Sequence, residues 1–184
     1  EAGGGWFLQL MFRNLSGLIR YRGLIQSLVA RELKARYRGS VLGFFWSFIN
    51  PLLLLLIYSF VFTYVLENRT EGVQPYALFM FCGILPWNWF SSSLTEASGS
   101  LIAGGNLIKK VLFPAEILPL VSVLANMVHF FLGLPILVVF LVYYQHPPDW
   151  IDLFWFPVAV LVQLIFTAGL ALFLAALAVH FRDI

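Results

Sequence analysis

Four long apolar stretches constrain this sequence more than any other feature. They cover residues 41–66, 76–100, 117–144 and 153–179. A helix rises about 1.5 Å per residue and the hydrocarbon layer of a bilayer is roughly 30 Å thick, so each stretch is long enough to span it. The strict alternation that a membrane β-strand needs is absent from 52–57 and 130–140. We therefore predict an all-α fold, a polytopic transmembrane helix bundle.

The composition agrees with a membrane environment. Hydrophobic residues make up 61% of the 184 residues and charged residues only 11%, whereas soluble domains average about 45–50% and about 25%. A soluble fold of this size could not hide so much apolar surface from water. Cys82 is the single cysteine, so the sequence supports neither a disulfide framework nor a cysteine metal site.

Candidate kinks are the prolines inside the first three stretches, at Pro51, at Pro86, and at Pro119 with Pro135. Each proline removes a backbone hydrogen bond and can kink a helix. If Pro51 opened the first span, only 51–66 would remain, which is about 24 Å of helix and short for a bilayer. We therefore predict a kinked helix there. A re-entrant half-helix followed by a short span is the alternative.

The positions of Lys and Arg predict the orientation in the membrane. Seven of the eleven precede the first stretch, two lie between the second and third, and one follows the fourth. Arg69 alone lies between the first and second stretches, on the opposite side of the membrane from the other ten. Cytoplasmic loops carry an excess of these residues. Both ends of the chain, with 1–19 as a lead-in, are therefore expected in the cytoplasm, together with the loop that contains Lys109.

Tryptophans lie near the expected ends of the spans. Trp87, Trp89, Trp150 and Trp155 would be near the outer interface and Trp46 near the inner one. Trp is enriched at both membrane interfaces, so an aromatic belt is the favoured interpretation. Stacking of these rings against sugars is the alternative.

The segment 20–38 has the pattern of an amphipathic helix. On a helical wheel one narrow arc contains Arg20, Ser27, Arg31, Lys34 and Arg38. The broad opposite side contains Tyr21, Leu24, Ile25, Leu28, Val29 and Leu33. Such a helix lies along a membrane surface with its apolar face down. It can be an anchor for anionic lipid alone or have an added role in transport.

Few ionisable residues lie within the apolar stretches or at their ends. The candidates are Glu96, His129 and His180, and no pair has metal-ligand spacing. Neither a nucleophile elbow nor a phosphate-binding loop is present in the sequence. We therefore predict no catalytic residue, no metal site and no ATP hydrolysis in this chain. Energy for active transport would have to come from a partner.

Two further segments are unusual. The run 91–100, SSSLTEASGS, carries small hydroxyl residues that favour close helix packing, with a wet path as the alternative. The short cytoplasmic segment 106–119 combines two Lys with Val111, Leu112 and Phe113, which we expect to be exposed. Exposed apolar residues of this kind suggest a docking surface for another protein. Shallow burial in the bilayer is the alternative.

Two runs carry a resemblance to a known family. They are 31–52, RELKARYRGSVLGFFWSFINPL, and 107–119, LIKKVLFPAEILP. Together they closely resemble the permease subunits of ABC-2 type polysaccharide exporters, a group that includes the O-antigen, teichoic acid and capsule systems. The similarity extends over 26–184.

The resemblance implies a function and partners. It implies a permease of the bacterial inner membrane that exports undecaprenyl-diphosphate-linked glycan, O-antigen above all. A homodimer of permeases would join two nucleotide-binding subunits, which would hold the ATP and Mg²⁺. Another cargo, such as teichoic acid, capsule, drug or lipid, or a channel or carrier not driven by ATP, is the alternative.

The resemblance also implies site residues. The segment that would couple to the ATPase subunit contains Lys109, Lys110, Val111, Leu112, Phe113, Pro114, Ala115 and Glu116. The interfacial helix would attract the lipid headgroup through Arg31, Lys34, Arg36 and Arg38, and the channel-lining residues are not assigned. Family members usually have six spans, whereas the transmembrane domain 41–184 has four, so two C-terminal spans are expected to be missing.

Overall fold

The structure, a computed structural model, describes residues 21–36, 38–39, 43–61, 76–105, 113–145 and 148–181. Its elements are α2 (Arg22–Arg36), η1 (Gly43–Phe45), α3 (Trp46–Phe60), α4 (Tyr76–Ala103), α6 (Ile117–Tyr143) and α7 (Trp150–His180). Every regular element in these ranges is helical. The prediction of an all-α fold is therefore confirmed.

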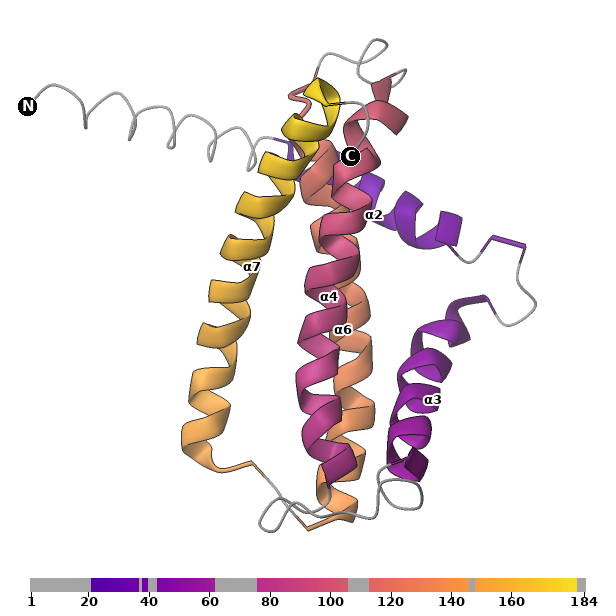
Figure 1. The fold of residues 1–184 in the computed structure, drawn as a ribbon, viewed down its shortest axis with the longest axis vertical. Coiled ribbons are helices and arrows are strands. Elements are labelled where there is room, and N and C mark those ends of the chain that lie inside the picture. The colour runs from indigo at the N-terminus through magenta and orange to yellow at the C-terminus, as the bar shows by residue number, and fades with distance from the viewer. Residues whose placement is uncertain are drawn as a thin grey trace, which may run out of the picture.

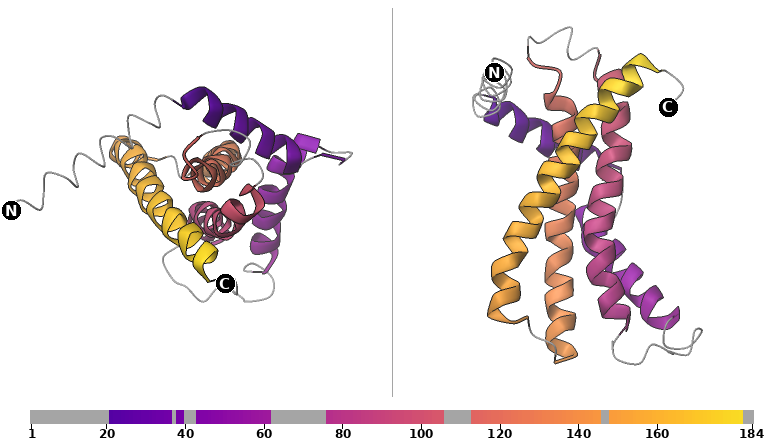
Figure 2. Two further views of the ribbon diagram at one scale, coloured as in Figure 1. Left: turned by 90° about the horizontal axis from the view of Figure 1, so that it is seen from above. Right: turned by 60° about the vertical axis from the view of Figure 1, so that its left-hand side comes forward.

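Three long helices form the body of the molecule. The helices α4, α6 and α7 run along its length, and α3 lies beside them over the lower half (Figure 1). Seen from above, α4 and α6 are central, and α7, α2 and α3 surround them (Figure 2). The central pair is therefore covered on several sides, and a site between α3, α4 and α6 lies inside the bundle.

The interfacial segment forms α2, which lies across the upper part of the bundle (Figures 1 and 2). Its apolar face packs onto the beginning of α6 in a cluster formed by Leu28, Phe113, Ile117, Leu118 and Val121. Part of the face that the sequence assigns to lipid is thus covered by protein. After α2 the chain turns toward α3, and Gly39 and Gly43 there have positive φ values of 85° and 48°, which glycine tolerates without strain.

The contact between α4 and α6 is close. A Cβ atom on Gly133 of α6 would lie 2.6 Å from Cδ2 of Leu85 on α4. Around this contact, Leu85 packs in one core cluster with Leu55, Phe81, Trp89 and Phe130. Higher up, small residues replace large ones, since Ala97, Val123 and Ala171 bring α4, α6 and α7 together. Small side chains at such positions let helix backbones approach.

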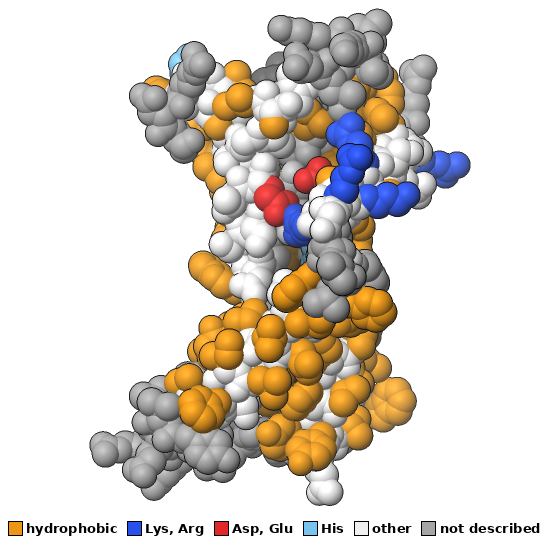
Figure 3. Space-filling view, turned by 90° about the vertical axis from the view of Figure 1, so that its right-hand side faces the viewer, with side chains coloured by type: hydrophobic (Ala, Val, Ile, Leu, Met, Phe, Trp, Pro, Cys, Tyr) orange, Lys and Arg blue, Asp and Glu red, His pale blue; other side chains and the backbone are white. Residues whose placement is uncertain are grey.

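The outer face of the bundle is apolar. Two of the described helices are long and apolar enough to cross a membrane, Ile117–Tyr143 and Leu153–His180. Most of their side chains are not covered by the rest of the chain, and on α7 Trp150, Phe154 and Ile165 are 87%, 71% and 64% exposed. Apolar side chains cover the lower part of the space-filling view (Figure 3). Lipid is the solvent that suits such a surface.

The prolines lie inside helices. Helix α3 begins at Trp46 and continues through Pro51, so the helix does not open at this proline. Its 15 residues measure about 22 Å, and 62–75 lies outside the described residues. Pro86 and Pro135 lie within α4 and α6, and α7 contains Pro157, which is not among the predicted kinks.

Trp89 differs from the expectation of an aromatic belt. It is 2% exposed, and its indole Nε1 donates a hydrogen bond to the carbonyl of Val123 at 3.1 Å. Its ring stacks on that of Phe130, with centroids 5.2 Å apart. The ring therefore belongs to the α4–α6 interface, whereas Trp87, Trp150 and Trp155 are exposed as a belt requires.

Candidate functional site: a polar cavity among four helices

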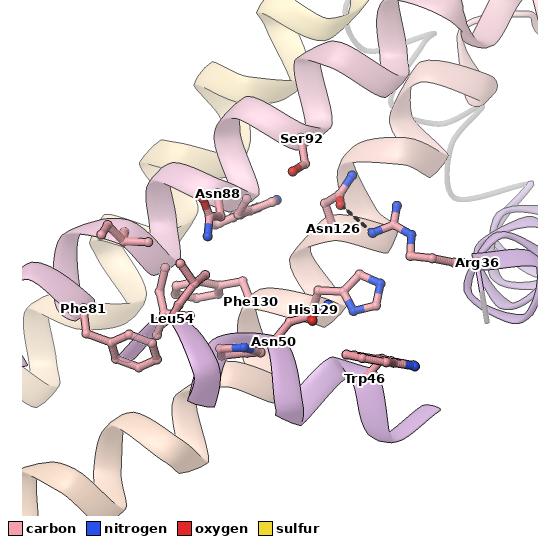
Figure 4. Close-up of a pocket in the computed structure, with 14 residues that line it drawn as sticks. Arg36, Trp46, Asn50, Leu54, Phe81, Asn88, Ser92, Asn126, His129 and Phe130 are labelled. Carbon is pink, nitrogen blue, oxygen red and sulfur yellow. Dashed lines mark hydrogen bonds between the residues drawn. The ribbon is translucent and has the colours of Figure 1, made fainter. Parts of the chain in front are cut away.

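A cavity of about 440 Å³ lies where α2, α3, α4 and α6 meet. Its polar lining comes from Arg36, Asn50, Asn88, Ser92, Asn126 and His129. Its apolar lining comes from Trp46, Pro51, Leu54, Phe81, Ile84, Leu85, Trp89 and Phe130. The labelled side chains converge on this space from all four helices (Figure 4). Polar groups within an apolar bundle mark a site where a polar ligand or water can be accommodated.

Helical spacing builds the polar wall. On α4, Asn88, Ser92 and Glu96 follow one another at intervals of four residues. On α6, Asn126 and His129 are three residues apart. Residues three and four apart share one face of a helix. The polar faces of α4 and α6 therefore meet, although both helices are mainly apolar.

Arg36, Glu96 and Asn126 form a closed ring of hydrogen bonds. Arg36 Nη2 donates to Glu96 Oε1 at 2.6 Å, an ion pair, and Arg36 Nη1 donates to Asn126 Oδ1 at 3.1 Å. The Asn126 amide Nδ2 donates to Glu96 Oε2 at 2.7 Å and to the Ser122 carbonyl at 3.0 Å. The ring ties the C-terminal turn of α2 to both central helices.

The ring is partly open to solvent. The side chains of Arg36 and Glu96 are 30% and 32% exposed, whereas Asn126 is 3% exposed. A pair that retains this much contact with solvent contributes little stability of its own, about 0–1 kcal/mol. The buried Asn126 amide orients the two charged groups, so the arrangement holds a guanidinium in place at the wall of the cavity.

Arg36 faces the bundle because of its place on α2. It follows Val29 by seven residues and Leu33 by three, so it lies on the apolar side of the helix. Arg31 and Lys34 point away from the bundle and are exposed, as is Arg38 beyond the helix end. In the space-filling view the charged side chains gather in the upper half, above the apolar region, and the surface is indented between the two (Figure 3).

The four cationic residues predicted to meet a headgroup therefore lie in two places. Arg36 lines the cavity, and Arg31, Lys34 and Arg38 are on the outer surface. Of the segment predicted to couple to an ATPase subunit, Lys109, Lys110, Val111 and Leu112 lie outside the described residues. The expected exposure of Phe113 is wrong, because this ring is 8% exposed and packs against Leu28 of α2. Pro114 and Glu116 are exposed and Ala115 is half-buried.

The amide side chains of the cavity are not among the residues predicted from the sequence. Asn50, Asn88 and Asn126 each lie in a predicted span, and a signal was available, because polar residues in a membrane helix usually face the bundle interior. The run 91–100 contributes both to close helix packing and to the lining of the cavity. Ser93 is fully buried and donates to the Trp89 carbonyl at 2.6 Å, whereas Ser92 lines the cavity.

The lining of the cavity suits the binding of a polar ligand. The described residues contain no cluster of three or more His, Cys, Asp or Glu that could hold a metal ion. The lining offers a guanidinium, three amides and a hydroxyl beside aromatic rings, which suit phosphoryl and sugar oxygens. An apolar helix bundle with such a cavity has the features of a membrane transport protein.

The family follows from comparison with known proteins. The chain belongs to the ABC-2 type transporter family, whose model matches residues 23–184. This match confirms the resemblance seen in 31–52 and 107–119.

Named relatives agree with this assignment. The chain is 45% identical over 174 residues to the O-antigen export system permease protein RfbA of Myxococcus xanthus, covering 95% of this chain and 65% of that protein. It is 37% identical over 161 residues to RfbA of Klebsiella pneumoniae, covering 88% and 61%. It is 26% identical over 172 residues to the capsule polysaccharide export inner-membrane protein CtrC of Neisseria meningitidis, covering 91% and 63%. The chain thus spans less than two thirds of the length of these relatives.

Proposed function

We propose that the chain is the membrane-spanning part of a permease that exports a lipid-linked polysaccharide, O-antigen in the first instance, across the bacterial inner membrane. The observation that carries the proposal is the 45% identity, over nearly the whole chain, to a protein named as an O-antigen export permease. The family match supports the same class of transporter.

The polar cavity supports a role in passing a hydrophilic cargo through lipid. A glycan has many hydroxyl groups, and a transport path must replace part of their hydration. Asn50, Asn88 and Ser92 can exchange hydrogen bonds with such groups, while Trp46 presents aromatic surface at the same cavity. We assign these residues to the inner part of the path, which the sequence alone left unassigned.

The energy source in this proposal is a separate nucleotide-binding subunit. The sequence contains no phosphate-binding loop, so ATP and Mg²⁺ would be held by two copies of the partner, joined to two copies of the permease. The segment 106–119 would contact that partner. Among its described residues Pro114 and Glu116 are exposed and available for this contact, and Phe113 connects the segment to α2.

The proposed topology has four crossings of the inner membrane by this chain, with α2 on the cytoplasmic side. The support is the excess of Lys and Arg on the side of α2 and 106–119. The lengths of α4, α6 and α7, at 28, 27 and 31 residues, are sufficient for full spans. Asp149 and Trp150 would lie on the opposite, outer side.

Capsule polysaccharide is the second candidate cargo. The 26% identity to a capsule export protein over 91% of this chain favours the shared class of cargo, a polysaccharide. A shared fold does not fix function, so this likeness supports the class of cargo and not one particular glycan.

The test is an export assay with the full-length gene in its host. A deletion strain complemented with the full-length protein should display the glycan at its surface. Surface glycan should disappear when the nucleotide-binding subunit carries an inactivated phosphate-binding loop, although both subunits are still made. Glycan export that persists with an inactive ATPase would contradict the proposal and favour a channel or an ion-coupled carrier.

A further inference from the structure

In the ring of Arg36, Glu96 and Asn126, the Glu96 carboxylate is the anion that pairs with the Arg36 guanidinium. Arg36 is among the residues that line the cavity, whereas Glu96 is not. One amino group of the guanidinium is used by Glu96 and the other by Asn126. The cationic group presented to the cavity is therefore neutralised from behind by a carboxylate.

We propose that Glu96 is the resting counter-ion of Arg36 and that a diphosphate group entering the cavity from the α2 side displaces it. This inference rests on the proposed function, because a lipid-linked glycan supplies such a group. It adds Glu96 and Asn126 as residues that determine how strongly the anion is held.

The exposure of the ring makes the exchange feasible. About a third of each charged side chain contacts solvent, so the pair is screened and its partners can separate without leaving a buried charge behind. A diphosphate carries more negative charge than a carboxylate and accepts two parallel hydrogen bonds from a guanidinium. The incoming anion is thus the stronger partner for Arg36.

The surroundings of Arg36 favour an anion over a cation. Asn50, Asn88 and Ser92 can donate to phosphoryl oxygens from the walls of the cavity. The volume of the cavity, about 440 Å³, lies within the range of about 300–1,000 Å³ that is usual for ligand sites. Outside, the exposed Arg31 and Lys34 raise the local concentration of anions near the entrance.

Asn126 acts in this proposal as a positioning residue. It is 3% exposed and bonded at Nδ2 to the Ser122 carbonyl of its own helix, so its amide is fixed before and after exchange. When the anion replaces Glu96, the contact from Arg36 Nη1 to Asn126 Oδ1 can remain. The guanidinium then stays aimed at the cavity while one partner is replaced.

The experiment measures binding to the full-length permease in complex with its ATPase subunit, in nanodiscs of zwitterionic lipid. The probes are inorganic pyrophosphate, a short-chain prenyl diphosphate and the corresponding prenyl alcohol. Glu96→Gln should raise the affinity for the diphosphates roughly three- to tenfold, because it removes the competing anion. Arg36→Gln should lower it by about tenfold or more, and the double variant should lack the gain.

Matched variants separate this mechanism from simple surface charge. Arg31→Gln removes one cation from the outer face of the same helix and should change the affinity by less than about twofold, with an effect that salt abolishes. Arg36→Lys keeps the positive charge but cannot form the bidentate pair of hydrogen bonds of a guanidinium. It replaces Arg36→Gln in the experiment if Arg36→Gln fails to copurify with the ATPase subunit. A gain with pyrophosphate and prenyl diphosphate alike identifies the diphosphate as the recognised unit, and a gain with the prenyl compound alone identifies the lipid-linked form.

The inference is overturned if Glu96→Gln leaves the affinity for both diphosphates unchanged, if the alcohol gains as much as they do, or if Arg36 and Arg31 variants behave alike. Its failure is distinguishable from failure of the proposed function. Export that needs the ATPase but is insensitive to these substitutions contradicts only the proposed exchange of Glu96 for a diphosphate. Export without ATPase activity contradicts the proposed function, and the binding result still stands.

Discussion

At the scale of residues, buried polar groups define the centre of this molecule. Asn126 is the most connected of them, since it contacts Arg36, Glu96 and the Ser122 carbonyl. A buried polar group that loses its partners costs more than the hydrogen bond itself contributes. The ring is therefore a place where single substitutions of similar size should have clear effects.

Asn126→Leu should destabilise the full-length protein by about 1–3 kcal/mol, because Arg36 and Glu96 each lose a partner next to an apolar side chain. Asn50→Leu is the control, since Asn50 is exposed at the same cavity. Thermal unfolding in detergent measures both. Equal midpoints for the two variants would show that the ring does not contribute to stability.

Trp89→Phe should cost roughly 1 kcal/mol, because it keeps an aromatic ring beside Phe130 and removes the hydrogen bond to the Val123 carbonyl. Trp89→Ala should cost about 3–5 kcal/mol by leaving a cavity in the core. Trp87→Ala, at a 62% exposed position, is the control and should change the unfolding midpoint little. If Trp87→Ala lowered the unfolding midpoint more than Trp89→Ala, the assignment of Trp89 to the core would be wrong.

At the scale of elements, the pairing of α4 with α6 and the docking of α2 onto α6 organise the structure. The sequence predicts the elements well, because apolar runs of 25 or so residues between polar segments leave few alternatives to membrane helices. It predicts their contacts poorly. Phe113 and Trp89 look like surface residues in the linear pattern, and only the packing of Leu28 and Phe130 against them shows that they are covered.

Part of the site could have been predicted in the same way. Arg36 falls on the apolar side of α2, seven residues after Val29, so a partner in the bundle was to be expected. That the partners are Glu96 and Asn126 could not be read from spacing, because they are 60 and 90 residues away. Such contacts depend on how the helices pack.

Gly133→Leu should separate α4 from α6, since even a Cβ at this position approaches Leu85 Cδ2 to 2.6 Å. Overpacking of this kind costs about 1–3 kcal/mol. Gly83→Leu is the control, because its Cβ would meet no atom within 4 Å, and Leu85→Ala should partly rescue Gly133→Leu. Unfolding midpoints report all four variants, and equal losses at the two glycines would contradict the close contact.

Phe113→Ala and Glu116→Lys should have different effects, although both lie in 106–119. Phe113 packs against Leu28, so its loss should lower the unfolding temperature through a cavity. Glu116 is exposed at the N-terminal end of α6, so its charge reversal should cost less than about 1 kcal/mol of stability and reduce copurification with the ATPase subunit. Normal copurification and export with Glu116→Lys would remove this residue from the docking surface.

At the scale of the whole molecule, two surfaces with opposite demands are combined in one bundle. The outer face of α6 and α7 is apolar and largely uncovered, whereas the cavity among α2, α3, α4 and α6 has polar as well as apolar side chains in its lining. The charged side chains cluster at the level of α2 (Figure 3). This arrangement suits a transport protein in lipid, with a cavity that Arg36 of α2 helps to line.

The central claim is that the bundle crosses the membrane with α2 in the cytoplasm and the α6–α7 connection outside. It is tested by single-cysteine variants Arg31→Cys and Asp149→Cys in a full-length protein that lacks Cys82, probed with a membrane-impermeant maleimide. In spheroplasts Asp149→Cys should be labelled and Arg31→Cys should be protected until the membrane is permeabilised. Labelling of Arg31→Cys from outside, with Asp149→Cys protected, would contradict the account.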